Sequence, residues 1–355
     1  MTNLFNDLLK DSESIFKNPV ALDYDYHPKL VPYRENEQHY MANCIKPLLQ
    51  NRNGKNLFIF GKPGIGKTIA TRHVLKDLEE NSDEVQQIYI NCWKKDTPYK
   101  IVLEICDQIG YKWIQQKKTD ELFQKVKEIL NKTSAVLVLD EADKLEDVSI
   151  IYSIAEDIYK KSIFFITNDK EWINNLDQRL RSRLIPENLE FKPYNMEETK
   201  GILKQRVTYA FHSNVFDEKA FNLIAEKTYH LNDIRTGLFL LKEAALIAEN
   251  KSLKKVSLEH SQEAIEKLTN FTPKDEKNLQ DDEKEILELI KKNSGKSIKE
   301  LYGIYSANKE LAYRTFQKKI KQLETAKQIT LKDHKEGWGY YKTVEFGYKK
   351  TLNDF

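Results

Sequence analysis

The sequence lacks the features of membrane-embedded and secreted proteins. None of its apolar runs approaches the ~18 residues that a membrane-spanning helix requires. The N-terminal segment 1–17 is amphipathic and partly acidic, without the charged-then-apolar order of a secretory signal. We therefore expect a cytoplasmic protein with no membrane partner.

Cysteine is also scarce, with three residues in a chain of 355. Cys44, Cys92 and Cys106 are widely spaced and form no CxxC pair, so they predict buried thiols rather than a disulfide framework or a zinc site. The seven histidines are scattered, and none is paired at metal-ligand spacing. A structural metal site is therefore not expected.

The chain has little excess charge of either sign. Its 57 lysines and arginines nearly balance 55 aspartates and glutamates, which leaves a net charge of +2. Any affinity for nucleic acid must therefore come from a local basic surface. The length and the apolar content of 40% indicate two or three folded domains.

A glycine-rich loop is the most informative feature that is present. It follows the apolar run 57–60, precedes a helix-like segment over 69–78, and reads Gly61-Lys62-Pro63-Gly64-Ile65-Gly66-Lys67-Thr68. Glycines let backbone N–H groups surround phosphate oxygens, while Lys67 would reach the β- and γ-phosphates and Thr68 would bind Mg²⁺. A chance match in a turn is the alternative, which the flanking strand and helix disfavour. The loop predicts binding of ATP and ADP.

Polar side chains follow two later predicted strands. The continuous apolar run 135–139 predicts a strand buried on both faces, and Asp140 and Glu141 come directly after it. Asp140 would then hold Mg²⁺, and Glu141 would orient or activate the attacking water. An acidic turn that caps the next helix is the alternative. Asn168 follows the strand 162–167 and would contact the γ-phosphate or the water, or else serve only as a turn residue.

Strands alternate with helices up to a last strand near 189–191, which predicts an α/β domain with a mainly parallel sheet. After it only helical patterns are found, at 195–209, 217–228, 232–249 and 257–268. A polar segment without periodicity follows and is interpreted as a linker. We therefore predict a nucleotide-binding domain with its lead-in over 1–193, a helical lid over 194–269 and the linker over 270–281.

The remaining segment 282–355 predicts a winged-helix domain. Its pattern is three helices followed by two strands, at 282–293, 297–305, 309–325, 328–331 and 339–344, with a wing loop over 332–338. On the third helix we expect Ala312, Phe316, Ile320 and Leu323 to be core.

The winged-helix segment is locally basic. Between residues 296 and 350, lysine and arginine outnumber aspartate and glutamate by 13 to 6. We expect Arg314, Lys318 and Lys321 on the third helix to contact DNA, together with Lys335 and Trp338 of the wing. Protein contacts, or a surface that is merely soluble, are the alternatives.

Two groups of arginines each allow two interpretations. Arg179 and Arg183 lie in a dense basic stretch, 176–184, which is either a solvated face or a source of charge for a neighbouring active site. Arg235 follows Asn232-Asp233-Ile234 at the start of a lid helix, from which it either reaches a γ-phosphate or remains a surface side chain.

In this order, the loop, the Asp-Glu pair, the strand-end Asn168, the Ser182-Arg183 pair, the lid and the wing resemble the AAA+ replication initiators. More narrowly, the chain is similar to the archaeal origin-recognition and helicase-loading family, which is related to the eukaryotic origin recognition complex. The resemblance implies that Asn168 is the sensor-1 residue, Arg235 the sensor-2 residue, and Arg183 or Arg179 an arginine finger. Asn232 replaces the glycine that usually precedes the sensor-2 motif, and asparagine tolerates the same backbone angles.

The resemblance also implies how the nucleotide and DNA are bound. Tyr33 and Arg34 lie in a segment, 28–37, that packs near the adenine in this family, and residues 91–99 match the start of a helical insert that touches DNA. The implied function is an ATP-dependent initiator that binds double-stranded origin DNA, hydrolyses ATP slowly as a switch, and recruits the minichromosome-maintenance (MCM) helicase with other initiator subunits. The alternatives are an AAA+ winged-helix regulator of transcription or signalling, and an accessory ATPase of transposition.

Overall fold

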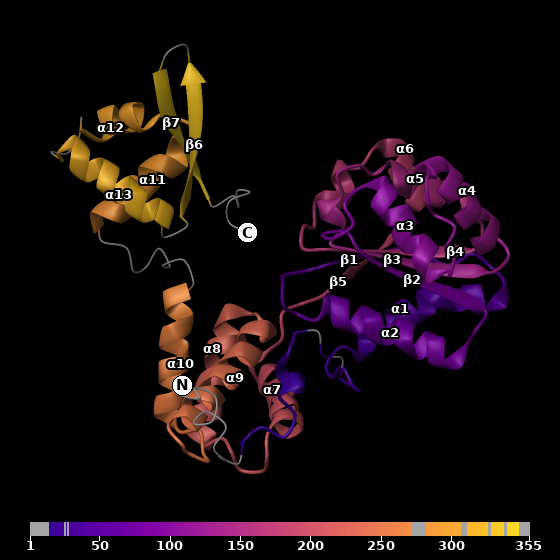
Figure 1. Ribbon diagram of the computed structural model, residues 1–355, viewed down its shortest axis with the longest axis horizontal. Coiled ribbons are helices and arrows are strands. Elements are labelled where there is room, and N and C mark those ends of the chain that lie inside the picture. The colour runs from indigo at the N-terminus through magenta and orange to yellow at the C-terminus, as the bar shows by residue number, and fades with distance from the viewer. Residues whose placement is uncertain are drawn as a thin grey trace, which may run out of the picture. The chain divides into compact units, whose positions relative to one another are not determined.

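The computed structural model describes residues 14–24, 26, 28–271, 281–306, 311–325, 328–336 and 339–347. Contacts divide the chain into two compact units, residues 1–261 and residues 262–355. Each unit is described separately, and both are drawn in Figure 1.

The first unit is built on a five-stranded sheet whose strands all run parallel. Its strand order is β2-β3-β4-β1-β5, so β2 and β5 are the edges. The strands are β1 (Leu57–Phe60), β2 (Val85–Asn91), β3 (Ser134–Asp140), β4 (Lys161–Thr167) and β5 (Glu187–Glu190). Every residue of β3 is buried, as the continuous apolar run predicts. The α/β fold expected from the sequence is confirmed.

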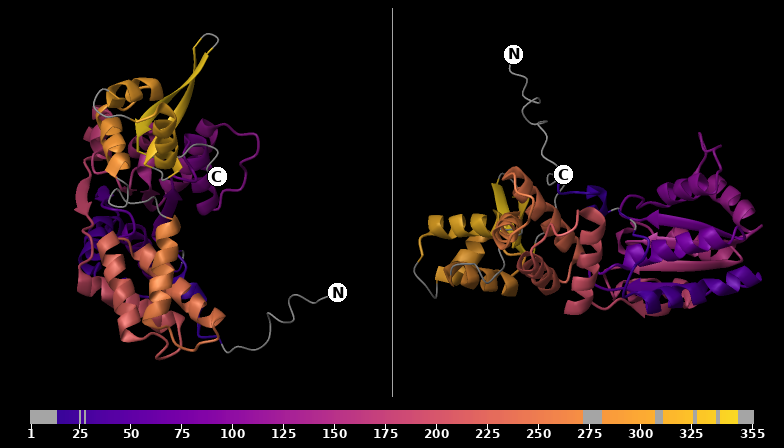
Figure 2. Two further views of the ribbon diagram at one scale, coloured as in Figure 1. Left: turned by 90° about the vertical axis from the view of Figure 1, so that its left-hand side faces the viewer. Right: turned by 90° about the horizontal axis from the view of Figure 1, so that it is seen from below.

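Helices cover both faces of this sheet, as Figures 1 and 2 show. One layer contains α3 (Pro98–Gln108), α4 (Thr119–Leu130), α5 (Ser149–Asp157) and α6 (Gln178–Leu184), and the other contains α1 (Glu35–Ile45) and α2 (Lys67–Asn81). Short 3₁₀ helices lie at Pro19–Leu22, Lys46–Gln50, Ala142–Lys144 and Trp172–Asn175.

The two apolar cores divide the side chains of β3. Leu137 and Leu139 pack in the core beneath α3 and α4, whereas Val136 and Val138 pack in the core beneath α2. Side chains alternate along a strand, so Asp140 lies on the same face as Val136 and Val138. Its carboxylate is thereby directed toward the start of α2.

The lid helices follow the sheet as expected. They are α7 (Met196–Ala210), α8 (Glu218–Leu231), α9 (Ile234–Asn250) and α10 (Leu258–Phe271). Asn232 ends α8 in the left-handed conformation, with φ of 53°. Asp233 then caps α9, because its Oδ1 accepts a hydrogen bond of 2.8 Å from the backbone N–H of Arg235. Asparagine therefore adopts the angles expected of the family's glycine, and α9 begins two residues later than the periodicity predicts.

The second unit has the winged-helix arrangement of three helices and an antiparallel ribbon (Figure 2). Its elements are α11 (Asp281–Lys292), α12 (Ile298–Ser306), α13 (Tyr313–Thr325), β6 (Ile329–Glu336) and β7 (Gly339–Phe346). Phe316, Ile320 and Leu323 are core as predicted. Ala312 is exposed, so its assignment to the core is wrong, because the helix begins one residue after it.

The wing differs from the prediction. Residues 332–336 were expected in a loop but belong to β6, where Lys332 pairs with Thr343 and Glu336 with Gly339. A ribbon held by main-chain hydrogen bonds needs no apolar side chains, so this polar stretch carries no strand signal. Lys335 therefore lies within a strand instead of a loop.

The three cysteines are buried free thiols, as expected. Within the ranges that the structure describes, no helix is both long enough and apolar enough to cross a bilayer.

Candidate nucleotide-binding site

A cavity of about 570 Å³ lies in the first unit, where the glycine-rich loop, the ends of β3 and β4, and the lid meet. It brings together most of the residues that the sequence singled out, although they are spread over more than 170 positions of the chain. Among its lining residues are Gly64, Gly66, Lys67, Thr68, Asp140, Glu141, Asn168 and Arg235. The other four residues of the loop, Gly61, Lys62, Pro63 and Ile65, are not among the residues that line this cavity.

The loop is in direct contact with the lid. Gly64 has φ of 74°, and a Cβ atom there would lie 1.9 Å from Oδ1 of Asp233. The backbone N–H of Ile234 donates to the carbonyl of Gly64 over 3.2 Å. Only glycine combines this backbone angle with such a close approach. The conformation of the loop and the position of the first turn of α9 are therefore coupled.

Lys67 lies at the first turn of α2 with its ammonium group inside the loop. Its Nζ donates to the carbonyl oxygens of Gly61 and Lys62, at 2.7 and 2.8 Å, and to Oδ1 of Asn168 at 2.7 Å. Burial lowers the pKa of Lys67 to about 8, although the nearby carboxylates of Glu141 and Asp140 oppose this shift. The lysine is thus held where phosphate oxygens would meet it.

This lowered pKa predicts that nucleotide affinity depends on pH. Phosphates stabilise the charged lysine and raise its pKa in the complex, so binding above pH 8 requires uptake of a proton. Affinity should be constant below that pH and fall by up to about tenfold per pH unit above it. Titration of a fluorescent ADP analogue between pH 7 and 9.5 would measure this. In Lys67→Arg the guanidinium stays charged, so its profile should be flat; an equally flat wild-type profile would contradict the prediction.

Asp140 is almost fully buried, with 2% exposure, and its carboxylate accepts three hydrogen bonds. Oδ2 accepts from the Thr68 hydroxyl at 2.8 Å and from the Tyr89 hydroxyl, while Oδ1 accepts from the backbone N–H of Glu141 at 3.0 Å. Burial, followed by the charge of Asp140, raises the pKa of Tyr89, so its phenol remains a donor. A hydroxyl and a carboxylate oxygen this close form a hard, oxygen-only donor set, which fits Mg²⁺.

Glu141 and Asn168 form the second polar pair at the strand ends. The Asn168 amide donates to Oε2 of Glu141 over 3.1 Å, and its oxygen accepts from Lys67. Burial raises the pKa of Glu141, and the charges of Asp140 and Asp143 raise it further. Glu141 also has φ of 56°, an unfavourable backbone angle of the kind that functional sites retain. The pair is positioned to orient a water molecule and to accept its proton.

Arg34 and Tyr33, which the resemblance places near the adenine, are not among the residues that line this cavity. The Arg34 guanidinium is buried, donates to the carbonyl oxygens of Ile65 and Lys192 at 3.0 and 2.6 Å, and lies 3.9 Å from the Tyr194 ring centroid. These contacts connect the lead-in segment to the backbone of the glycine-rich loop and to the segment that follows β5. The Tyr33 hydroxyl lies against Gly201 of α7.

Other residues of the lead-in and the lid line the cavity instead. The proline-punctuated stretch before α1 had indicated the lead-in residues among them, whereas no sequence signal had singled out those from residue 194 onward. These other residues are Tyr24, Pro28, Val31, Pro32, Tyr194, Ile202, Gln205, Arg206 and Leu238. Most are apolar or aromatic, which suits the flat face of a nucleotide base.

The remaining predicted residues are distributed over several elements. Arg235 lines the cavity, and its charge acts on Lys67. Arg179 and Arg183 are exposed on α6 and do not line this cavity, and Arg183 pairs with Glu156 at 3.2 Å. The exposed DNA-contact candidates on α13 are Arg314, Lys318 and Lys321. Trp338 and the side chain of Lys335 lie outside the described part of the chain.

Comparison with known families identifies the domain that contains the sheet and the helical lid that follows it. Residues 50–171 match the AAA domain, and residues 200–266 match the Cdc6 AAA+ ATPase-type lid domain. The ORC1-type DNA replication protein 1 of Sulfurisphaera tokodaii is 34% identical over 281 residues, which cover 74% of this chain and 70% of the relative. The protein of the same name from Archaeoglobus fulgidus is 32% identical over 327 residues, 85% of this chain and 79% of that one.

Solved structures extend the similarity over both units. The Aeropyrum pernix ORC1 protein in complex with DNA matches with a TM-score of 0.70 and 25% identity, over 96% of this chain and 95% of that chain. Cdc6p from Pyrobaculum aerophilum matches with a TM-score of 0.67 and 18% identity, over 95% of each chain, which shows the shared fold. The chain therefore belongs to the family of ORC1-type DNA replication proteins.

Proposed function

We propose that this protein is an ATP-dependent replication initiator that binds double-stranded DNA at an origin. One observation carries the proposal: in a chain of this family, the phosphate-binding loop, the strand-end carboxylates and the lid residue Arg235 line a single cavity. A binding protein without ATPase function would need neither Glu141 nor its contact with Asn168.

The residues have separate roles in this proposal. The loop amides and Lys67 hold the phosphates, Thr68 and Asp140 hold Mg²⁺, and the apolar residues of the lead-in and lid hold the adenine. Bound Mg²⁺ supplies positive charge that offsets the charge of the phosphate oxygens. Glu141 accepts the proton of the attacking water, and Asn168 orients both the Glu141 side chain and the water.

Arginines would supply the positive charge that stabilises the γ-phosphate during hydrolysis. Arg235 belongs to the lid of the same chain, so its contact would exist only while the lid is close to the loop. Arg183, or else Arg179, is exposed on α6 and would act on the site of a neighbouring initiator subunit. Bound ATP would hold the lid and base together through the Gly64–Ile234 contact, and slow hydrolysis would release it.

DNA binding is assigned to two surfaces. On α13, exposed Arg314, Lys318 and Lys321 would enter the major groove or contact phosphates. In the first unit, the loop 110–118 between α3 and α4 carries four lysine or tryptophan side chains, and Trp113 is 80% exposed. The structure of the similar Aeropyrum pernix ORC1 protein is a complex with DNA, which supports DNA binding as such.

We propose four functional parts for the chain: a nucleotide-binding domain over 1–193, a helical lid over 194–269, a linker over 270–281 and a winged-helix domain over 282–355. We also propose that the protein is cytoplasmic and associated with the nucleoid. Its partner after origin binding would be the MCM helicase.

Mapping of the protein along its host genome tests the function. The wild type should occupy a few sharp sites that coincide with early replicating DNA, and Arg314→Glu with Lys318→Glu should reduce that occupancy about tenfold or more, since each lost phosphate contact lowers the salt-dependent affinity. The control, Lys292→Glu with Lys299→Glu, makes the same charge change at exposed positions of α11 and α12 and should leave the sites occupied. Occupancy of promoters with empty replication starts would favour a regulator instead.

A further inference from the structure

Tyr89 belongs to none of the nucleotide-binding motifs, yet it reaches the predicted magnesium site. It lies on β2, the edge strand of the sheet, opposite Val138 of β3, and Asn91 lies opposite Asp140. Its ring packs with the α2-side core that also contains Val138. Tyr89 and Asp140 are therefore on the same face of the sheet, on a diagonal between neighbouring strands.

The Tyr89 hydroxyl completes the hydrogen bonding of Asp140. It donates to Oδ2, the oxygen that also accepts from Thr68 at 2.8 Å, while Oδ1 accepts from the Glu141 N–H. Three donors from β2, α2 and the β3 end therefore fix both the position and the rotation of one carboxylate. Of the three donor residues, Tyr89 is the one to which the proposed function assigns no direct contact with phosphate, Mg²⁺ or water.

Polar contacts hold Tyr89 in turn. Its backbone N–H donates to Oε1 of Gln108 at 2.9 Å, and its carbonyl accepts from Nε2 of Gln108 at 2.7 Å, so an α3 side chain replaces the missing neighbour strand. The same amide donates to Glu104 at 2.8 Å. The guanidinium of Arg72 lies over the Tyr89 ring, 4.1 Å from its centroid.

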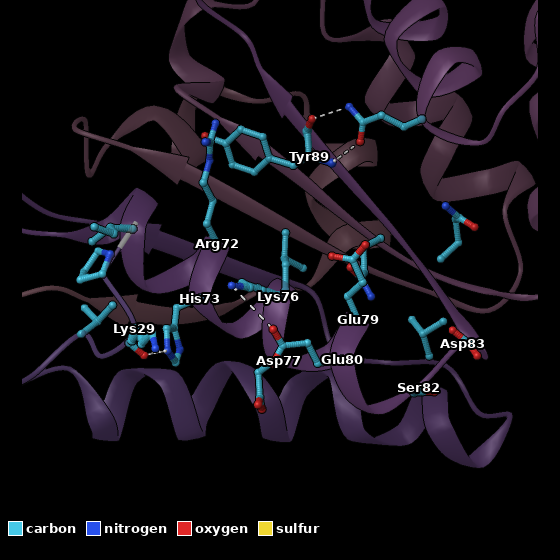
Figure 3. Close-up of a pocket in the computed structure, with 18 residues that line it drawn as sticks. Lys29, Arg72, His73, Lys76, Asp77, Glu79, Glu80, Ser82, Asp83 and Tyr89 are labelled. Atoms are coloured by element: carbon cyan, nitrogen blue, oxygen red, sulfur yellow. Dashed lines mark hydrogen bonds and ion pairs between the residues drawn. The ribbon is translucent and has the colours of Figure 1, made fainter. Parts of the chain in front are cut away.

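The contacts with Gln108 and Arg72 are needed because apolar side chains do not surround the Tyr89 ring on every side. Tyr89, Arg72 and Gln108 also line a second cavity of about 920 Å³ beside α2 and the open edge of β2, shown in Figure 3. Arg72 and Thr68 are four residues apart, so α2 presents both on one face toward β2. The position of the phenol thus depends on Arg72 and Gln108 as well as on apolar packing.

We propose that Tyr89 is a positioning residue that holds the Asp140 carboxylate in the orientation required to bind Mg²⁺. This inference rests on the proposed nucleotide and magnesium site. Groups that hydrogen-bond a metal-binding carboxylate fix its direction, and their loss commonly weakens metal affinity by about tenfold or more. The phenol does this from the sheet edge, without contacting the phosphates.

The test separates metal binding from nucleotide binding and from hydrolysis. Tyr89→Phe keeps the ring and its contact with Arg72 but removes the hydroxyl. Binding of a fluorescent ADP analogue is titrated with Mg²⁺ and repeated with excess chelator. We expect the half-saturating Mg²⁺ concentration to rise about tenfold, with unchanged binding in chelator and an unchanged unfolding temperature.

A matched control exists in the same unit. The Tyr40 hydroxyl donates to the Glu187 carboxylate over 2.5 Å, so Tyr40→Phe removes a similar hydrogen bond away from the cavity and should not shift the Mg²⁺ requirement. Gln108→Met, which releases the Tyr89 backbone, should shift it in the same direction as Tyr89→Phe. An unaltered Mg²⁺ requirement in Tyr89→Phe, with Mg²⁺-dependent wild type, would overturn this inference alone. A wild type that binds nucleotide without any Mg²⁺ dependence would overturn the proposed metal site as well.

Discussion

Lys67→Ala is expected to reduce nucleotide affinity by at least about 100-fold. Lys67 is 7% exposed, and its ammonium group is held by the carbonyl oxygens of Gly61 and Lys62, where phosphate oxygens would meet it. Charge-assisted hydrogen bonds contribute about 1.5–3 kcal/mol each, and two of them correspond to a factor of about 10²–10⁴ in affinity. Titration of a fluorescent ADP analogue by anisotropy would measure the loss.

Lys62 supplies the matched control for this substitution. It belongs to the same loop, but its side chain is exposed and does not line the cavity. Lys62→Ala should therefore change the affinity by less than about threefold, as expected for an exposed charge. Equal losses in the two variants would indicate general attraction of the nucleotide by positive charge and would contradict the specific role of Lys67.

The parts of the site that could be predicted are those whose chemistry depends on residues adjacent in sequence. The glycine-rich loop is contiguous, and its glycines mark the backbone angles that it adopts, such as φ of 74° at Gly64. Asp140, Glu141 and Asn168 were predictable for a related reason. They follow buried parallel strands, and the carboxyl ends of such strands meet at one edge of the sheet.

Other contributors could not be predicted, because they depend on register and on packing between distant segments. Nothing local to Tyr89 indicates that its hydroxyl reaches Asp140, which lies 51 residues later and on another strand. The contacts that bury the Arg34 guanidinium could not be predicted either, because Ile65, Lys192 and Tyr194 come from distant parts of the chain. The strand at 332–336 was missed because a polar ribbon has no apolar pattern to detect.

The second large effect is expected for Glu141→Gln, which should retain nucleotide binding and lose hydrolysis. Glutamine has the same shape and can keep the contact with Asn168, but it cannot accept a proton from water. Loss of a general base typically reduces turnover about 10²–10⁴-fold. Phosphate release under saturating ATP would measure turnover, and the affinity for ADP should stay within about threefold because Glu141 supplies no phosphate contact in this assignment.

A substitution at Asp143 tests whether the effect at Glu141 comes from its role as a base or from the loss of any nearby negative charge. It lies two residues from Glu141, but its carboxylate accepts from the Thr167 hydroxyl at 2.7 Å and pairs with Lys144, and it does not line the cavity. Asp143→Asn should therefore retain most of the turnover. If Asp143→Asn stalled hydrolysis while Glu141→Gln did not, the base would have to be reassigned. The raised pKa of Glu141 makes the assignment chemically reasonable, because a carboxylate that is less well solvated accepts a proton more readily than one in water.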